Sequence, residues 1–339
     1  MASRAFTVDL HGHILVPAVE RLVARRPEKQ AEPEIQLRTM GAASVEHNAR
    51  VMLPSVGPKL TNLDLRLADL DRLGIDLQVM SPSPTQYYYW ADPDLARELV
   101  RTQNEAIAEA CAGNPTRLRG LGNVALQHSD LSVEQLEYAV KQLGLAGVEV
   151  STSVNGLELA DEKLEKFWAK AESLGAVVFI HPMGTSLGER LNRFYLSNLV
   201  GNPAETTIAL SCLIFGGTLD RHPGVKIVAA HGGGYLPAYV SRSDHGYAVR
   251  PEAQAIRHPP SEYLKRIWFD SLVYEPEALR RLIDVVGSSQ VVVGTDYPFD
   301  MGHYEIRELV ESVPGLGEDE RLAILGGNAC RLLGLPESG

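Results

Sequence analysis

The chain has 339 residues, of which 45% are hydrophobic and 22% are charged, and its formal net charge is −11. That composition is ordinary for a globular protein with a sizeable core, and its acidity disfavours nucleic acid and anionic membranes as partners. No stretch approaches the ~18 apolar residues of a membrane helix, and the N-terminus has no apolar run of signal-peptide length. The three cysteines are far apart, which fits a reducing compartment, so we expect a cytoplasmic protein.

Short apolar runs rich in β-branched residues alternate with helix-like segments along the chain. We predict strands at 5–11, 75–81, 117–126, 147–152, 176–181, 225–231, 267–271 and 291–296. Helical spacing predicts helices at 62–74, 92–113, 132–144, 161–175 and 275–287. This alternation favours a parallel sheet covered by helices, and eight units fit one closed (β/α)₈ TIM barrel over 1–339. An open doubly wound sheet is the alternative, but no G-x-G-x-x-G opens a helix after the first strand.

The segment 14–61 interrupts this alternation between the first strand and its helix. It is too long for a simple βα loop, and Pro, Arg and Asn are frequent in it. An insertion after a barrel strand lies at the carboxyl-terminal face, where active sites form. We predict a partial lid with little regular structure, and an arm used in oligomer contacts is the alternative.

Histidine and aspartate stand at the ends of several predicted strands. His11 and His13 form an H-x-H pair at the end of the first strand, His181 follows AVVFI, and Asp296 follows VVVG. Residues at i and i+2 of a strand share a face, and the carboxyl ends of barrel strands converge on one pocket. Each residue alone is a weak signal, because single polar residues at strand ends are commonly structural. Together they predict a three-histidine, one-aspartate set for one divalent ion, with room for water or substrate.

Further polar residues lie near the same strand ends. His231 begins the run HGGG, whose glycines clear space for a ligand, so it is either another metal ligand or an acid/base that activates the metal's water. Asp270, in WFDS, either orients one of these histidines or accepts backbone amides. Glu149 is a candidate buried charge without an assigned role. The aromatic run YYYW at 87–90 lines the pocket mouth or forms a subunit contact.

Several short motifs occur in a fixed order over nearly the whole chain. They are HGH at 11–13, HP at 181–182, PAET at 203–206, HGGG at 231–234, PPSEY at 259–263, WFDS at 268–271, GTDYPF at 294–299 and GNA at 327–329. This set resembles the amidohydrolase-2 group of the amidohydrolase superfamily. Within that group it is most similar to the metal-dependent decarboxylases of the α-amino-β-carboxymuconate-ε-semialdehyde and γ-resorcylate type. The resemblance is strongest from 176 to 333 and weakest across 14–61.

The resemblance implies one divalent metal ion, zinc first, with manganese or cobalt as alternatives. It implies that His11, His13, His181 and Asp296 hold this ion. It also implies that His231 is the acid/base beside the metal-bound water, which makes His231 and Asp296 the catalytic residues.

The resemblance also implies substrate-binding residues and an oligomer. Arg50 in the predicted lid and Arg242, eleven residues after His231, are the candidate carboxylate-binding arginines. In the resembling decarboxylases the second arginine enters the neighbouring subunit's pocket, so we expect a homodimer or a higher homo-oligomer. Phe194 and Phe299 match family aromatics that stack on a flat substrate, and packing at the core or rim is the alternative for each.

The leading functional prediction is a non-oxidative decarboxylase of a planar, unsaturated or aromatic carboxylic acid. A metal-dependent hydrolase or hydratase of a small carboxylate-bearing substrate uses the same ligands and is the alternative. A non-catalytic metal binder is disfavoured, because the ligand set and an acid/base candidate are both complete. Release of CO₂ without incorporation of water separates the first two.

Overall fold

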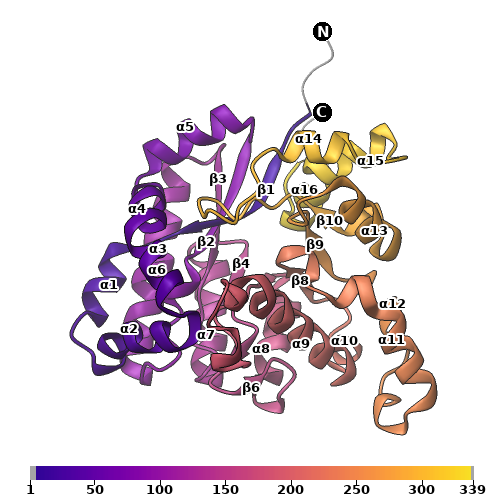
Figure 1. The fold of residues 1–339 in the computed structure, drawn as a ribbon, viewed down its shortest axis with the longest axis horizontal. Coiled ribbons are helices and arrows are strands. Elements are labelled where there is room, and N and C mark those ends of the chain that lie inside the picture. Colours follow the sequence, from indigo (N-terminus) through magenta and orange to yellow (C-terminus); the bar gives the residue numbers. More distant parts are fainter. Residues whose placement is uncertain (1–4, 337–339) are drawn as a thin grey trace.

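Eight parallel strands form the centre of the computed structural model, which describes residues 5–336 (Figure 1). Their order around the sheet is their order along the chain, and bridges from Asp9 to Val293 and from Gly12 to Tyr297 close the ring. The predicted (β/α)₈ barrel is therefore confirmed. The barrel strands are β1 (Val8–Ile14), β2 (Leu77–Pro82), β3 (Leu118–Gly122), β4 (Gly147–Val150), β7 (Val177–Ile180), β8 (Lys226–Ala229), β9 (Trp268–Asp270) and β10 (Val291–Val292).

Helices follow the strands and cover the outside of the barrel. The start of α5 shows why they begin where they do: Asn62 Oδ1 accepts the backbone N–H groups of Asp64 and Leu65 at 2.9 and 3.2 Å. The helix ends at Gly74, whose φ of 69° suits glycine. The long covering helices are α5 (Leu63–Leu73), α6 (Pro93–Gly113), α7 (Ser129–Lys141), α8 (Glu165–Leu174), α9 (Asn202–Phe215), α11 (Leu236–Val249) and α13 (Pro276–Val286).

The described chain also contains shorter elements outside the barrel strands and the long helices. They are the hairpin strands β5 (Ser153–Val154) and β6 (Leu157–Glu158) and the helices α10 (Thr218–Arg221), α12 (Pro260–Leu264), α14 (Ile306–Glu311), α15 (Glu318–Leu322) and α16 (Asn328–Leu333). Among residues 5–336, no helix has the length and apolar character needed to cross a membrane.

The segment between β1 and α5 is helical, so the prediction of little regular structure across 14–61 is wrong. It contains α1 (Pro17–Val23), α2 (Pro27–Met40), α3 (Ala42–His47), a π-helical turn (Asn48–Met52) and α4 (Leu53–Thr61), gathered on one side of the barrel (Figure 1). The helix α2 buries none of its residues and contains Pro33. It therefore lacks the apolar face from which a sequence pattern predicts a helix.

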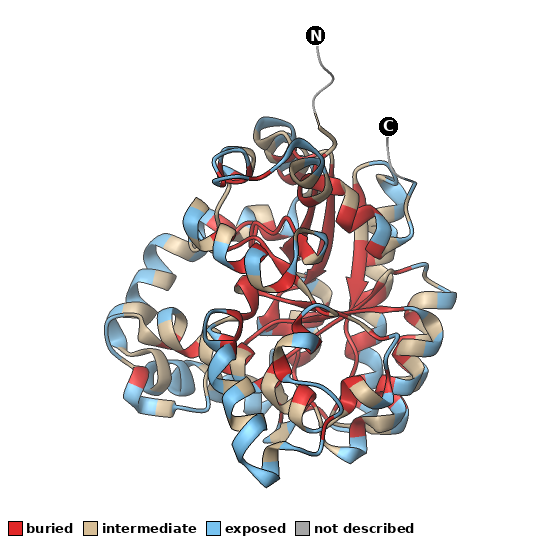
Figure 2. Ribbon diagram, turned by 90° about the vertical axis from the view of Figure 1, so that its right-hand side faces the viewer, coloured by how far each residue is buried: buried red, intermediate tan, exposed pale blue. Residues whose placement is uncertain are grey.

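The barrel has an inner and an outer apolar layer. Val177 and Phe179 belong to a cluster inside the ring of strands, whereas Val178 and Ile180 pack between the strands and the helices. This alternation follows from the pleat, since successive strand side chains point to opposite faces. Figure 2 shows the buried strands at the centre and the exposed outer faces of the helices. Phe179 lies against the His11 ring, with 4.9 Å between ring centroids, and so provides an apolar floor for the polar residues at the carboxyl end.

Candidate metal centre

The four predicted ligands meet at the carboxyl end of the barrel. His11 and His13 belong to β1, His181 directly follows β7, and Asp296 lies shortly after β10. All four are buried, and one ligand atom of each lies within 4.8 Å of the others. Because these residues come from three separate parts of the barrel, the closed sheet is what brings them together.

The distances between these side chains fit one shared ion. His11 Nε2 lies 3.1 Å from His13 Nε2 and 3.5 Å from Asp296 Oδ1, and His13 Nε2 lies 3.2 Å from the same oxygen. Ligand atoms bonded to one tetrahedral zinc at about 2.0–2.1 Å are separated by about 3.3 Å. The nitrogen and oxygen donors also suit borderline divalent metals.

The protonation states of His181 and Asp296 fit a divalent cation as well. Neither ring nitrogen of His181 has a hydrogen-bond partner within the described chain. Burial, reinforced by the nearby His13 and His11, holds the pKa of His181 well below its usual value, so its lone pair is available. Burial tends to raise the pKa of Asp296, but the charge of His11 and the hydrogen bond to His13 outweigh it and hold this pKa well below its usual range. An unpartnered neutral imidazole beside an ionised carboxylate is the arrangement that metal coordination requires.

Asp270, at the end of β9, connects His11 to the HGGG turn. Its Oδ2 lies 2.7 Å from His11 Nδ1 and accepts the backbone N–H of His231 at 2.9 Å, while Oδ1 accepts the N–H of Gly232 at 2.7 Å. Asp270 therefore fills both of the roles that the sequence left open. The contact of Nδ1 with a carboxylate leaves the Nε2 lone pair of His11 directed toward the other metal ligands. Burial opposes ionisation of Asp270, but the bond to His11 outweighs it and lowers the pKa of Asp270.

His231 stands beside Asp296 and outside the four-residue cluster. Its Nε2 lies 3.7 Å from Asp296 Oδ2, and its side chain is 14% exposed. The residue adopts a left-handed φ of 55°, which is uncommon for a non-glycine residue and typical of constrained functional positions. Gly234 shows how tightly the turn is folded, because a Cβ there would lie 2.2 Å from Pro203 O. His231 therefore lies next to the four-residue cluster without being one of its members.

The structure shows a buried polar network behind β1 that the sequence analysis did not predict. Asp9 Oδ2 accepts a hydrogen bond from Gln78 Nε2 at 2.7 Å, and Arg66 of α5 donates to Gln78 Oε1 at 2.6 Å and to the backbone carbonyl of His13. Gly12 makes room for it, since a Cβ at this position would lie 2.6 Å from the Gln78 amide. The middle residue of the H-G-H motif is therefore small because the network passes directly behind the two histidines. The available signals were two polar residues, Asp9 and Gln78, within apolar runs predicted as strands.

The comparison with known families agrees with this centre. The family model described as "Amidohydrolase" matches residues 8–335, which is nearly the whole chain. The chain belongs to the amidohydrolase family. The resemblance predicted from the motifs is thus confirmed.

Sequence relatives of this amidohydrolase include named decarboxylases. A 2-amino-3-carboxymuconate-6-semialdehyde decarboxylase of Dictyostelium discoideum is 36% identical over 343 residues, which cover 98% of this chain and 92% of the relative. A gamma-resorcylate decarboxylase of Rhodococcus jostii is 28% identical, covering 80% of this chain and 87% of the relative. The crystal structure of a 5-carboxyvanillate decarboxylase from Sphingomonas paucimobilis matches with a TM-score of 0.84 and 25% identity, covering 98% of this chain and 100% of that one.

A groove of about 890 Å³ lies among segments that follow the barrel strands β1, β7 and β10. Its walls come from the end of α2, from α3, from the loop 192–195 and from residues 300–301. Phe194 lines it and is 81% exposed, while the ring centroid of Phe299 lies 5.5 Å from that of His13. Both predicted aromatics therefore lie at the open end of the barrel, with Phe299 against a metal ligand.

The two predicted arginines occupy different surroundings. Arg50, in the π-helical turn, forms an ion pair with Glu46 at 2.8 Å, and its side chain is 77% exposed. Arg242 is an exposed residue of α11, a helix that extends outward at the lower right of Figure 1. Neither lines the groove, whereas Arg193, which the sequence did not single out, does.

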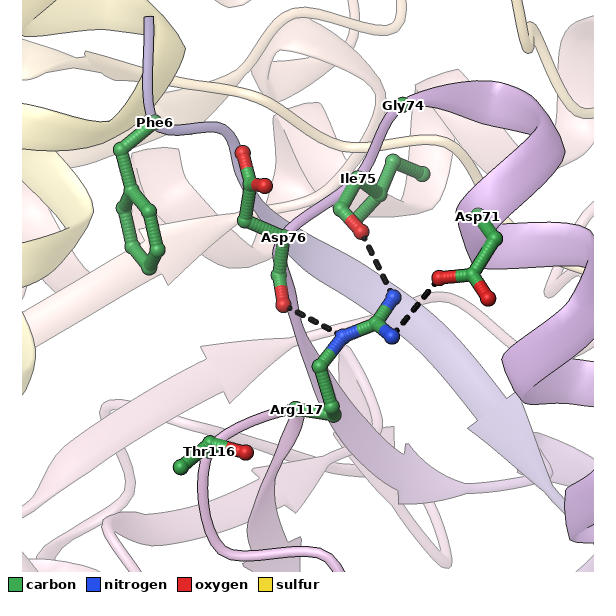
Figure 3. A pocket seen from close by; sticks show the side chains of 7 residues that line it. All are labelled: Phe6, Asp71, Gly74, Ile75, Asp76, Thr116 and Arg117. Atoms are coloured by element: carbon green, nitrogen blue, oxygen red, sulfur yellow. Dashed lines mark hydrogen bonds and ion pairs between the residues drawn. The ribbon is translucent and has the colours of Figure 1, made fainter.

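A second cavity, of about 380 Å³, lies at the opposite end of the barrel, where β1, β2 and β3 begin (Figure 3). Arg117 crosses it, donates to the backbone carbonyls of Ile75 and Asp76 at 3.1 and 2.8 Å, and pairs with Asp71 at 2.7 Å. Arg117 therefore connects the segments that lead into β2 and β3. We interpret this role as structural, because active sites of such barrels form at the other end.

Proposed function

We propose that this amidohydrolase is a metal-dependent, non-oxidative decarboxylase of a planar unsaturated or aromatic carboxylic acid. The observation that carries the proposal is the buried His₃Asp cluster, with His231 beside it, in a chain 36% identical over 98% of its length to a carboxymuconate-semialdehyde decarboxylase. The 5-carboxyvanillate decarboxylase structure supports the same class through its matching fold.

Decarboxylation replaces a carbon–carboxylate bond by a carbon–hydrogen bond and releases CO₂, so a proton must reach that carbon. A bound divalent ion supplies positive charge that stabilises electron density developing on nearby substrate oxygens. His231 holds the proton in this proposal, because its Nε2 lies beside the ligand set, 3.7 Å from Asp296 Oδ2. The Oδ1 atom of Asp296 faces the other ligands, and its Oδ2 atom faces His231. Asp296 therefore links the ligand set to the acid/base.

The proposed cofactor is one zinc ion on His11, His13, His181 and Asp296, because imidazole and carboxylate donors at this spacing suit zinc. Manganese and cobalt remain alternatives for the same donors. Bound metal is measured by elemental analysis of protein purified without chelator. Close to one ion per chain supports the proposal, and a folded, active, metal-free preparation contradicts it.

The groove is the proposed substrate site, and the helical segment 14–61 is its lid. Phe299 stacks on the flat substrate beside His13, and Phe194 covers it from the open side. Arg50 binds a substrate carboxylate only if its pair with Glu46 opens, because the pair occupies its guanidinium. Alanine substitution of Arg50 is therefore expected to raise KM with little change in kcat; an unchanged KM removes it from the substrate site.

The proposed active unit is a homodimer, or a higher homo-oligomer built from it, in which Arg242 completes the neighbouring subunit's pocket. Its exposure on α11 leaves the guanidinium available to a second copy of the chain. We also propose a cytoplasmic location, supported by the three cysteines, all of which are free.

The reaction is tested by incubating the metal-loaded protein in D₂O with γ-resorcylate, 5-carboxyvanillate and muconate-type acids. The expected result is CO₂ release with one deuterium on the carbon that carried the carboxylate. The matched control is metal-loaded His231→Ala, which keeps the ligand set. A product that gains oxygen from ¹⁸O-labelled water without releasing CO₂ overturns decarboxylation in favour of hydrolysis or hydration.

A further inference from the structure

Glu149 is a carboxylate inside the barrel that the proposed reaction does not use. It lies on β4 and is fully buried. One oxygen, Oε1, accepts a hydrogen bond from Tyr87 Oη at 2.6 Å. The other, Oε2, lies 3.6 Å from His13 Nδ1 and accepts no hydrogen bond from any residue between 5 and 336. The orphaned oxygen therefore faces the back of a metal ligand.

A carboxylate in this position is costly to keep. Removing a charge from water carries a large penalty unless the charge is paired and hydrogen-bonded, and an apolar residue of similar size usually packs there at lower cost. The ion-pair contact of this buried carboxylate is with His13, whose Nδ1 lies 3.6 Å from Oε2. The residue that faces the buried carboxylate is thus a predicted metal ligand.

The surroundings of His11 and His13 are parallel. The Nε2 atom of His11 faces the other metal ligands, and its Nδ1 atom lies 2.7 Å from the buried carboxylate of Asp270. His13 likewise turns Nε2 toward the cluster, while Nδ1 faces the backbone carbonyl of Pro82 at 3.2 Å, the Ser81 hydroxyl at 3.4 Å and the Glu149 carboxylate at 3.6 Å. The carbonyl alone can select the tautomer with a proton on Nδ1. What Glu149 adds is a negative charge behind the ring, which makes Nε2 a better donor to a cation.

Tyr87 explains why this charge stays in place. It belongs to the aromatic run 87–90, is itself buried, and stacks on Tyr89 with 5.5 Å between ring centroids. Its hydroxyl donates to Oε1, which leaves Oε2 directed at His13. Tyr87 of this run is therefore buried and bonded to Glu149, instead of lining the pocket mouth or forming a subunit contact as the sequence analysis expected for the run.

We propose that Glu149 is a positioning residue: its carboxylate, anchored by Tyr87, holds His13 and strengthens it as a metal ligand. The inference rests on the proposed metal-dependent function, but not on which acid is decarboxylated. Metal binding to the folded protein tests it without any substrate. A failure to find decarboxylase activity therefore leaves it standing.

The decisive variant is Glu149→Gln, which keeps the shape of the side chain and removes its charge. The dissociation constant for Zn²⁺ is measured by competition with a chromogenic chelator, and the visible spectrum is recorded after loading with Co²⁺. Loss of a group that supports a ligand typically weakens metal affinity by about 10–100-fold, and we expect a loss in that range together with an altered Co²⁺ spectrum. Affinity and spectrum equal to wild type overturn the proposal.

The matched control is Tyr87→Phe, which removes a buried hydrogen bond at the same place and keeps the carboxylate. We expect a clearly smaller loss of Zn²⁺ affinity than for Glu149→Gln. Equal losses in both variants contradict a charge effect and assign the result to packing. If the Gln variant does not fold, Glu149→Asp retains the charge but withdraws it by one methylene. That variant is expected to bind Zn²⁺ more weakly than wild type, and unchanged affinity again overturns the proposal.

Discussion

Gly294 packs against Asp270 and against the predicted metal ligand His11. Its replacement by alanine tests whether the contact between these two residues supports metal binding. A Cβ at this position would lie 2.7 Å from Asp270 Cβ and 2.9 Å from His11 Cβ, whereas ordinary contacts begin at 3.4 Å. The methyl group must therefore push Asp270 by about 0.7 Å and His11 by about 0.5 Å to reach normal separation. Both neighbours are fully buried and have little room to yield.

The expected cost follows from what the displaced groups do. The 2.7 Å contact between Asp270 Oδ2 and His11 Nδ1 orients His11 toward the metal cluster. Loss of such support weakens metal affinity by about 10–100-fold, or about 1.4–2.7 kcal/mol. Overpacking of a core adds its own penalty, so we expect Gly294→Ala to lower the free energy of unfolding of the metal-free protein by about 1–3 kcal/mol.

Two measurements separate these effects. Urea unfolding with chelator present reports the packing cost, and chelator competition reports the metal dissociation constant. Gly113→Ala is the control, because this glycine is exposed at the end of α6 and a Cβ there meets nothing within 4 Å. It should leave metal affinity unchanged. If Gly294→Ala binds metal as tightly as wild type, the contact between Asp270 and His11 does not support the centre.

Three further predictions address the reaction, the assembly and the pH dependence. His231→Ala should keep its metal and lose turnover by about 10²–10⁴-fold, as measured by elemental analysis and CO₂ release, and loss of metal would make this residue a ligand instead. Co-refolding of the inactive variants Arg242→Ala and Asp296→Ala should restore about a quarter of wild-type activity, given random pairing of independent sites; no recovery in proven mixed dimers contradicts a shared pocket. Glu20→Gln should destabilise the protein by about 1–2 kcal/mol at pH 7. Bonds from Tyr88 and Gln86 outweigh burial and lower the pKa of Glu20 from its usual 4.5, so its contribution is present above pH 4.5 and is lost as the pH falls through the lowered pKa. Urea unfolding should therefore show the two proteins converging in acid, and a constant difference contradicts the assignment.

Much of the barrel could be predicted from local patterns. The apolar runs at 176–181 and 225–231 correspond to β7 and β8, and the helical spacing at 92–113 corresponds to α6. These patterns are readable because a parallel strand buried on both faces is nearly continuous in apolar residues, and a covering helix repeats its apolar face every 3.6 residues. The same reasoning fails for α2, whose residues are all partly or fully exposed.

The sequence alone also predicts that His11, His13, His181 and Asp296 form one site. The reason is that strand ends in a closed barrel converge, independently of the loops that follow them. It determined the kinds of donor available and hence the class of metal. Their distances depend on how the strands pair, including the register shift in β1 between Asp9 and Gly12. No local pattern records that shift.

Only the tertiary structure decided what supports the centre. Asp270 reaches His11 across 259 positions of the chain, Glu149 approaches His13 from another strand, and Tyr87 meets Glu149 across 62 positions. Each contact depends on which face of its strand a side chain occupies and on which strand becomes its neighbour. Both are set by closure of the barrel as a whole, since a shift of one residue in the register of a strand would turn its carboxylate away from the metal centre.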